Sequence, residues 1–212
     1  VTSGGTTNLL RFKEPEKHTY IDPYEEMRAS LRDKEQSASD FFVRLNINAS
    51  PNVEAFVEID KATGNVLSGR GNGLIEIEAG EDLFTINGDY TLTGGKYNFS
   101  ALGIVNRVFD IQDGSSINFN GDIMNSNLNI DAIYNTKASL SSLLADDNSV
   151  SNRRNVQCGI SITDRLSNPR LEFSIDIPDL NPMIKSRVES ALSTEDKVQK
   201  QFLSILLSNN FL

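Results

Sequence analysis

The run Leu171-Glu172-Phe173-Ser174-Ile175-Asp176-Ile177 places an apolar side chain at every second position and a polar one between. Successive residues of a β-strand point to opposite faces of a sheet, so this spacing predicts a half-buried strand with one apolar and one polar face. Pro178 follows at once and marks the end of the run, because proline cannot donate to a neighbouring strand. The same alternation recurs over residues 41–177 and decides the fold class.

About ten such strands fit this region, separated by short segments with turn chemistry, such as 62–65, 93–95 and 113–115. Connections this short make consecutive strands antiparallel neighbours, which predicts an up-and-down meander. The outward positions carry mainly Asp, Glu and Asn, and helices are nearly absent, so the sheet must cover its own apolar face by curling. We therefore predict a mainly β fold. It is an antiparallel meander curled into a U-shaped sheet or a partly open barrel with an apolar interior, followed by C-terminal helices.

Three segments follow from composition. Residues 1–40 are polar and are expected to be partly helical and mobile; residues 41–178 form the curled sheet; residues 179–212 are helical. Asn181-Pro182 is a typical helix start, and Ser193 is expected to begin a second helix. One face of that second helix gathers Val198, Phe202, Ile205 and Leu206. We expect this face to close one end of the sheet; a surface for a partner or a membrane is the alternative.

Three consecutive inward positions of the predicted strand 67–79 carry no side chain, namely Gly69, Gly71 and Gly73. Interior glycine in a strand indicates a bulge, a bend or a close approach of another group. A bend or tight packing against a bulky neighbour explains the three glycines. A groove floor left open for an apolar chain is the alternative explanation.

Composition excludes several function classes. The chain has 212 residues with 20 basic and 29 acidic side chains, a net charge of −9 that disfavours binding to nucleic acid. A single His, His18, lies in the polar N-terminal segment, and a single Cys, Cys158, alternates with Val156 and Ile160 as a buried residue does. We therefore expect no enzyme activity, no cofactor and no metal site. No stretch is apolar enough to span a membrane as a helix.

Several ordered motifs carry a family resemblance. They are Gly94-Gly95-Lys96-Tyr97-Asn98-Phe99, then Phe109-Asp110-Ile111-Gln112-Asp113-Gly114-Ser115, then Leu128-Asn129-Ile130-Asp131-Ala132-Ile133-Tyr134, and finally Asn168-Pro169-Arg170-Leu171 with the strand quoted first. Together these motifs resemble the C-terminal domain of TamB, a subunit of the translocation and assembly module of Gram-negative bacteria. The resemblance spans about residues 41–212, and residues 1–40 show no counterpart.

The resemblance implies a curled sheet of the kind called a β-taco, whose apolar groove conducts phospholipid acyl chains between inner and outer membrane. It also implies support for outer-membrane protein assembly with a TamA-like or other Omp85-type barrel protein. The chain would then lie in the periplasm as part of a longer protein, anchored in the inner membrane by a segment that this chain lacks. The inward positions expected to line the groove are Leu45, Ile47, Val57, Ile59, Gly69, Gly71, Gly73, Ile75, Ile77, Phe84, Ile86, Tyr97, Phe99, Phe109, Ile111, Ile117, Phe119, Leu128, Ile130, Leu171, Phe173 and Ile175.

Two other functions stay open at this point. An open sheet edge predicts a protein-interaction module that binds an Omp85-type barrel or nascent barrel strands by β-augmentation. A closed sheet filled by its own side chains would have a purely structural role. The packing of the interior separates this last function from a lipid conduit.

Overall fold

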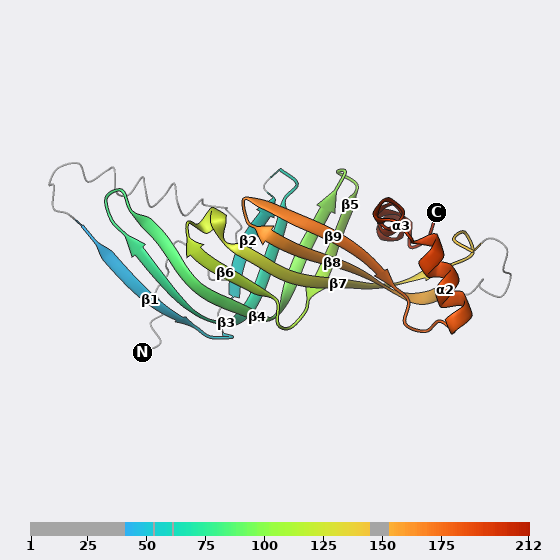
Figure 1. The fold of residues 1–212 in the computed structure, drawn as a ribbon, viewed down its shortest axis with the longest axis horizontal. Coiled ribbons are helices and arrows are strands. Elements are labelled where there is room, and N and C mark those ends of the chain that lie inside the picture. Colours follow the sequence, from blue (N-terminus) through green and yellow to red (C-terminus); the bar gives the residue numbers. More distant parts are fainter. Residues whose placement is uncertain (1–40, 53, 61, 145–152) are drawn as a thin grey trace.

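The computed structural model describes residues 41–52, 54–60, 62–144 and 153–212. Nine strands form one antiparallel sheet, and two helices follow it (Figure 1). The expected segment 1–40 lies outside the described residues, as do residues 145–152. The elements are β1 (Val43–Ala49), β2 (Glu54–Asp60), β3 (Asn65–Ala79), β4 (Phe84–Ala101), β5 (Val105–Ile111), β6 (Ser116–Gly121), the single 3₁₀ turn η1 (Ile123–Asn125), β7 (Asn127–Ser139), β8 (Arg153–Arg165), β9 (Asn168–Asp176), α2 (Pro182–Ala191) and α3 (Glu195–Ser208).

The expected meander is wrong at two places. β1 and β2 are consecutive but do not pair with each other, because both lie along β3. In the same way β5 and β6 both lie along β4, and β7 pairs with both of them. β3 and β4 have 15 and 18 residues, so each is long enough to hold two short strands placed end to end. The two short strands that share a long neighbour therefore lie end to end and together form one row of the sheet, with a break between them.

The expected turn at 93–95 is a β-bulge inside β4. Arg70 pairs with Gly94 while Gly71 pairs with Leu92, so Thr93 is the extra residue. Its hydroxyl Oγ1 donates to the carbonyl oxygen of Arg70 at 3.1 Å. A bulge bends and twists a strand without ending it, which merges two expected strands into one and gives nine strands instead of about ten.

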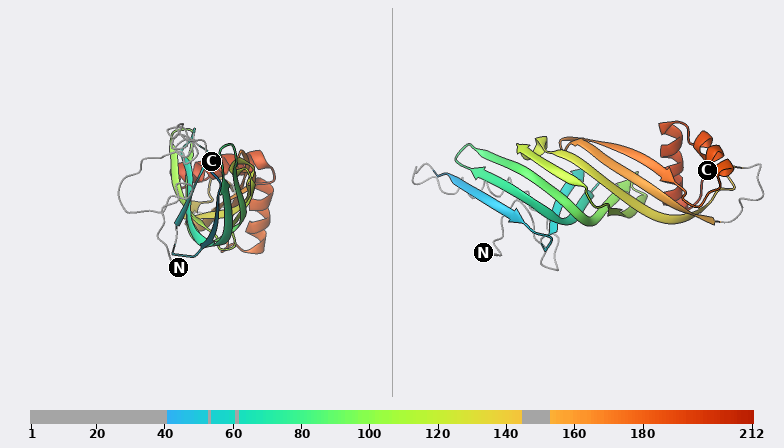
Figure 2. Two further views of the ribbon diagram at one scale, coloured as in Figure 1. Left: turned by 90° about the vertical axis from the view of Figure 1, so that its left-hand side faces the viewer. Right: turned by 60° about the horizontal axis from the view of Figure 1, so that its bottom comes forward.

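The break between β5 and β6 lies beside this bulge. The amide of Leu92 donates to the carbonyl oxygen of Ser115 at 2.7 Å, and the amide of Gly114 donates to that of Leu92 at 3.1 Å. The buried hydroxyl of Ser115 donates to Gln112 and accepts the amide hydrogen of Asp131 at 3.1 Å. Backbone groups freed by the break are thus paired locally. The sheet as a whole curls (Figure 2).

The helices close one end of the curled sheet. Asn181 caps α2 as expected, its side-chain oxygen accepting the amide hydrogen of Ile184 at 2.9 Å. α3 begins one residue later than expected, with Thr194 as its cap. Phe202, Ile205 and Leu206 of α3 are fully buried, and α3 packs against β9 and β5. The expectation that this helix covers one end of the core is therefore confirmed.

Candidate functional site

The inner face of the curled sheet is the candidate site. We define it as the apolar side chains that alternate along β1 to β9 and point into the curl. Most of the expected groove residues are buried in it: Ile59, Ile75, Ile77, Ile86, Tyr97, Phe99, Phe109, Ile111, Ile117, Phe119, Leu128 and Ile130. Half-buried positions lie nearer the sheet's ends or on β2: Ile47, Val57, Phe84, Leu171, Phe173 and Ile175. Leu45, on β1, is 38% exposed.

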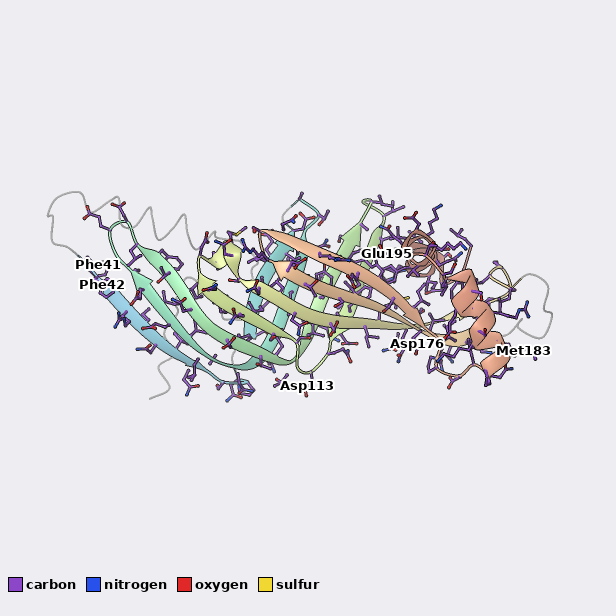
Figure 3. All side chains as sticks on the ribbon, viewed as in Figure 1. Phe41, Phe42, Asp113, Asp176, Met183 and Glu195 are labelled. Carbon is purple, nitrogen blue, oxygen red and sulfur yellow. The ribbon has the colours of Figure 1, made fainter. Side chains whose placement is uncertain are left out.

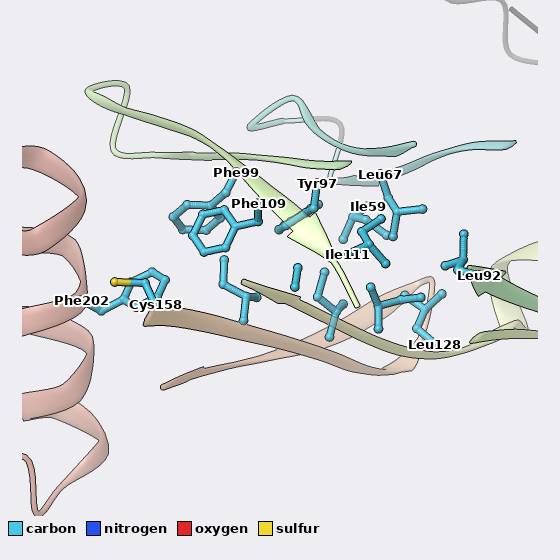
Figure 4. Close-up of a cluster of buried hydrophobic side chains, with 14 of the residues drawn as sticks. Ile59, Leu67, Leu92, Tyr97, Phe99, Phe109, Ile111, Leu128, Cys158 and Phe202 are labelled. Atoms are coloured by element: carbon cyan, nitrogen blue, oxygen red, sulfur yellow. The ribbon is translucent and has the colours of Figure 1, made fainter. Parts of the chain in front are cut away.

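At the α3 end the inner face is filled by the chain's own aromatic rings. The ring of Phe202 lies 4.6 Å from that of Phe173 and 6.1 Å from those of Phe99 and Phe109, measured between centroids. Phe99 also lies 6.0 Å from Phe173, so β4 meets β9 across the interior. Figure 4 shows Tyr97, Phe99 and Phe109 directed from their strands toward the opposite side of the curl. This end has the packing of a protein core.

The three glycines of β3 are explained by close approach of β4. A Cβ atom at Gly69 would lie 2.4 Å from Cδ2 of Leu92, one at Gly71 2.1 Å from the carbonyl oxygen of Thr91, and one at Gly73 2.4 Å from that of Asp89. Real Cβ atoms do not approach other heavy atoms so closely. Of the two explanations that the sequence left open, tight packing at a bend accounts for the missing side chains.

The outer face of the sheet carries charges that pair across strands. The guanidinium of Arg44 on β1 lies 2.5 Å from the carboxylate of Glu78 on β3, and Lys96 pairs with Asp110. The side chains are largely exposed, so these pairs contribute little to stability. They keep the outer face in water and leave the inner face apolar.

Few polar groups enter the interior of the described part. Its buried polar side chains are Asn65, Ser115, Ser126 and Ser204. The side-chain oxygen of Asn65 accepts the amide hydrogen of Ser100 at 2.6 Å, and the hydroxyl of Ser204 donates to the carbonyl oxygen of Asn210 at 2.8 Å. The buried hydroxyl of Tyr97 has no partner within the described ranges, and burial raises its pKa. Asn65 and Ser204 thus form hydrogen bonds with the backbone, and the rest of the described inner face is mainly apolar surface.

Burial raises the pKa of the Cys158 thiol from 9.0 to about 12. Because the folded state then holds this proton more tightly than the unfolded state, the thiol's contribution to stability is complete below pH 9 and is lost as the pH rises toward 12. We expect a loss of about 2 kcal/mol between pH 7.5 and 10.5 from this group alone. Denaturant titrations at both pH values check it. In Cys158→Ala the free energy of unfolding should differ clearly less between the two pH values, although the raised pKa of Tyr97 still contributes a part. An equal difference in this variant and in wild type would contradict the assignment to Cys158.

Some interior residues were absent from the expected groove. Leu67, Leu92, Ile160 and Ile162 are all fully buried, and each continues the same alternation that identified its neighbours, so the signal was present. Phe211 is 3% exposed, yet it follows α3 outside any periodic pattern, so no local signal predicts its burial.

Three comparisons bear on what this chain is. The family model of the TamB C-terminal domain matches residues 2–212. No curated protein and no solved structure matches the chain. The match begins at residue 2, so the expectation that residues 1–40 have no counterpart in the family is wrong. Within the described part, no helix is both long and apolar enough to cross a membrane.

Proposed function

This chain belongs to the family of TamB C-terminal domains, a transport and assembly module of the Gram-negative envelope, and we propose that its inner face shields phospholipid acyl chains between inner and outer membrane. Support comes from one observation: a sheet that curls, keeps its charges outside, and lines its inside with the apolar residues named above. In this proposal the chain acts in the periplasm. In this role it also supports assembly of outer-membrane proteins.

The β1 end is where we place the acyl chains. Leu45 is partly exposed and Ile47 and Phe84 are half-buried there, although Ile75, Ile77 and Ile86 beside them are at most 2% exposed. α3 and the aromatic rings fill the other end. Phe41, 55% exposed, precedes β1 (Figure 3), whereas the ring of Phe42 lies 5.8 Å from the guanidinium of Arg44 on the outer face. Burying each methylene of an acyl chain is worth about 0.8 kcal/mol, so such a surface holds a lipid without a specific polar contact.

Uptake of a fluorescent phospholipid by delipidated protein tests this proposal. Ile47→Asp places a charge on the inner face of an edge strand and is expected to weaken uptake at least tenfold, because a carboxylate beside an acyl chain loses its hydration. Asn48→Asp adds the same charge on the outer face of the same strand and should change uptake less than twofold. Thermal melts check that both variants fold. Two results would refute the proposal: no uptake by wild type together with no lipid in native mass spectra, or equal uptake by the two variants.

A second candidate function is binding of a strand from an Omp85-type barrel protein, TamA-like or other, or of a nascent barrel strand. It is favoured by the sheet order, in which β1 and β9 stand at the two ends and each pairs on one side only within the described ranges. Crosslinkers placed on these edges are expected to capture the barrel protein, while crosslinkers at Ile47 capture lipid. If only lipid adducts form, the result supports the first function and contradicts the second.

A further inference from the structure

β9 is an edge strand whose apolar face is only partly buried. It pairs with β8 on one side, and no described strand pairs with the other. Leu171, Phe173 and Ile175 are half-buried, although their direct partners on β8, namely Ile162, Ile160 and Cys158, are at most 1% exposed. The inner face therefore continues past β8 and is only half covered at β9.

The edge of β9 presents backbone groups to an incoming strand. Pro169 pairs with Asp164 of β8, and proline in a strand sits where its missing N–H would point away from the neighbour. In antiparallel strands the backbone groups of alternate residues point to the same side. Leu171, Phe173 and Ile175 share the parity of Pro169, so they direct their N–H and C=O groups to the free edge.

A cavity of about 390 Å³ borders this edge. Four consecutive residues of β9, 173–176, line it together with Val188 of α2, Leu192 at the C-terminal cap of α2 and Val198 of α3. Consecutive strand residues point to opposite faces, so a cavity that touches all four runs along the edge instead of over one face. Its helical wall supplies apolar surface for side chains that alternate along an added strand.

The charges at this edge indicate the partner's polar residues. Arg170 is already held by Glu172, with 2.9 Å between guanidinium nitrogen and carboxylate oxygen. Asp176 and Glu189 line the cavity with Lys185 as their only cationic neighbour in its lining, which leaves a net charge of −1. Asp176 lies at the end of β9 close to α2 and α3 (Figure 3). A Lys or Arg on the incoming strand near Asp176 is the complement.

We propose that β9 accepts an added strand from a partner protein, and that the cavity between β9 and the helices takes the strand's apolar side chains. The partner segment is extended, apolar at alternate positions and basic near Asp176. This proposal rests on the second candidate function and names its acceptor edge. β9 is preferred over β1 and β2, which also pair on one side only, because residues 153–212 around β9 are all described and none of them pairs with its outer edge. β1 and β2 instead adjoin residues outside the described ranges.

A synthetic nine-residue peptide that alternates Val or Leu with Thr and ends in Lys is the probe. Its binding is expected to slow hydrogen exchange at the amides of Leu171, Phe173 and Ile175 at least tenfold. The same peptide with N-methyl groups at alternate amides is the control, because it keeps the side chains but cannot complete a ladder. Protection of β1 amides alone would overturn the assignment to β9 while leaving strand binding intact. If the peptide still binds at β9 but crosslinkers on the sheet edges capture no barrel protein, the second candidate function is wrong and the assignment of the acceptor edge stands.

A pair of variants separates backbone from side chain. Leu171→Pro removes an edge-facing N–H and is expected to weaken peptide binding at least tenfold without breaking the ladder to β8. Leu171→Ala removes the side chain but keeps the N–H, and should weaken binding threefold or less. Circular dichroism melts confirm that both fold. Equal binding by Leu171→Pro and wild type would refute the proposal, as would sedimentation showing that a second copy of this chain already occupies β9.

Discussion

Replacing Phe202 with alanine is expected to lower the free energy of unfolding by about 3–5 kcal/mol. Phe202 is fully buried and its ring contacts those of Phe99, Phe109 and Phe173, which come from three different strands. Removing it leaves a cavity where α3 closes the sheet, and rings from paired strands cannot collapse into that space without breaking their register. Denaturant unfolding followed by circular dichroism measures the loss.

Leu207→Ala is the matched control for this prediction. Leu207 lies on the same helix, is 45% exposed, and its replacement by alanine keeps helix propensity high. Its cost should stay below about 1 kcal/mol. If both substitutions cost the same, α3 would stabilise the protein through its own helical structure, and the aromatic contact would not matter.

Replacing Gly71 with alanine is expected to cost about 2–4 kcal/mol, the second largest effect. The added Cβ would lie 2.1 Å from the carbonyl oxygen of Thr91 and 2.9 Å from Cα of Leu92. Both are backbone atoms of β4, so relief requires separating β3 from β4 at the bulge. Faster hydrogen exchange on both strands, together with a lower midpoint of unfolding, is the expected signature.

Gly80→Ala provides the comparison. The nearest atom to a Cβ at Gly80 is the carbonyl oxygen of Phe41 at 3.4 Å, and Gly80 does not occupy the left-handed region. Its effect should stay within about 0.5 kcal/mol, because alanine there also reduces the entropy of the unfolded chain. A loss at Gly80 as large as at Gly71 would show that glycine is needed at both sites for flexibility and not for space.

Alternation predicted the inner face well because burial on one side of a strand is a local property. Phe84 to Leu92 point inward at even positions, whereas Tyr97 and Phe99 do so at odd ones. The change of parity was therefore visible in the sequence. It was assigned to a turn at 93–95, since glycine pairs occur both in turns and in bulges, and only the pairing of Arg70 with Gly94 distinguishes them.

Strand pairing could not be predicted in the same way. Short connections favour neighbours, but the pairing of β1 with β3 depends on the length of β3 relative to its two short partners. The face of α3 was identified correctly from its periodicity. Which rings Phe202 meets could not be, because Phe99, Phe109 and Phe173 are brought together only by the curl of the whole sheet.

The broken rows and the bulge divide the strands β1 to β6 into two groups, which we call panels, and the line where the panels meet is here called the crease. On one side of it lie β1, β6 and the adjoining halves of β3 and β4; on the other lie β2, β5 and the remaining halves. The ladders of β1, β2, β5 and β6 with β3 and β4 each belong to one panel, whereas β7 pairs with both β5 and β6 and so joins the two panels. The bulge near Gly71 and Gly94 lies where the two panels meet, and a bulge bends the strand that carries it. For the proposed conduit we therefore expect any change in width to occur at this crease, because no ladder of β1, β2, β5 or β6 crosses it.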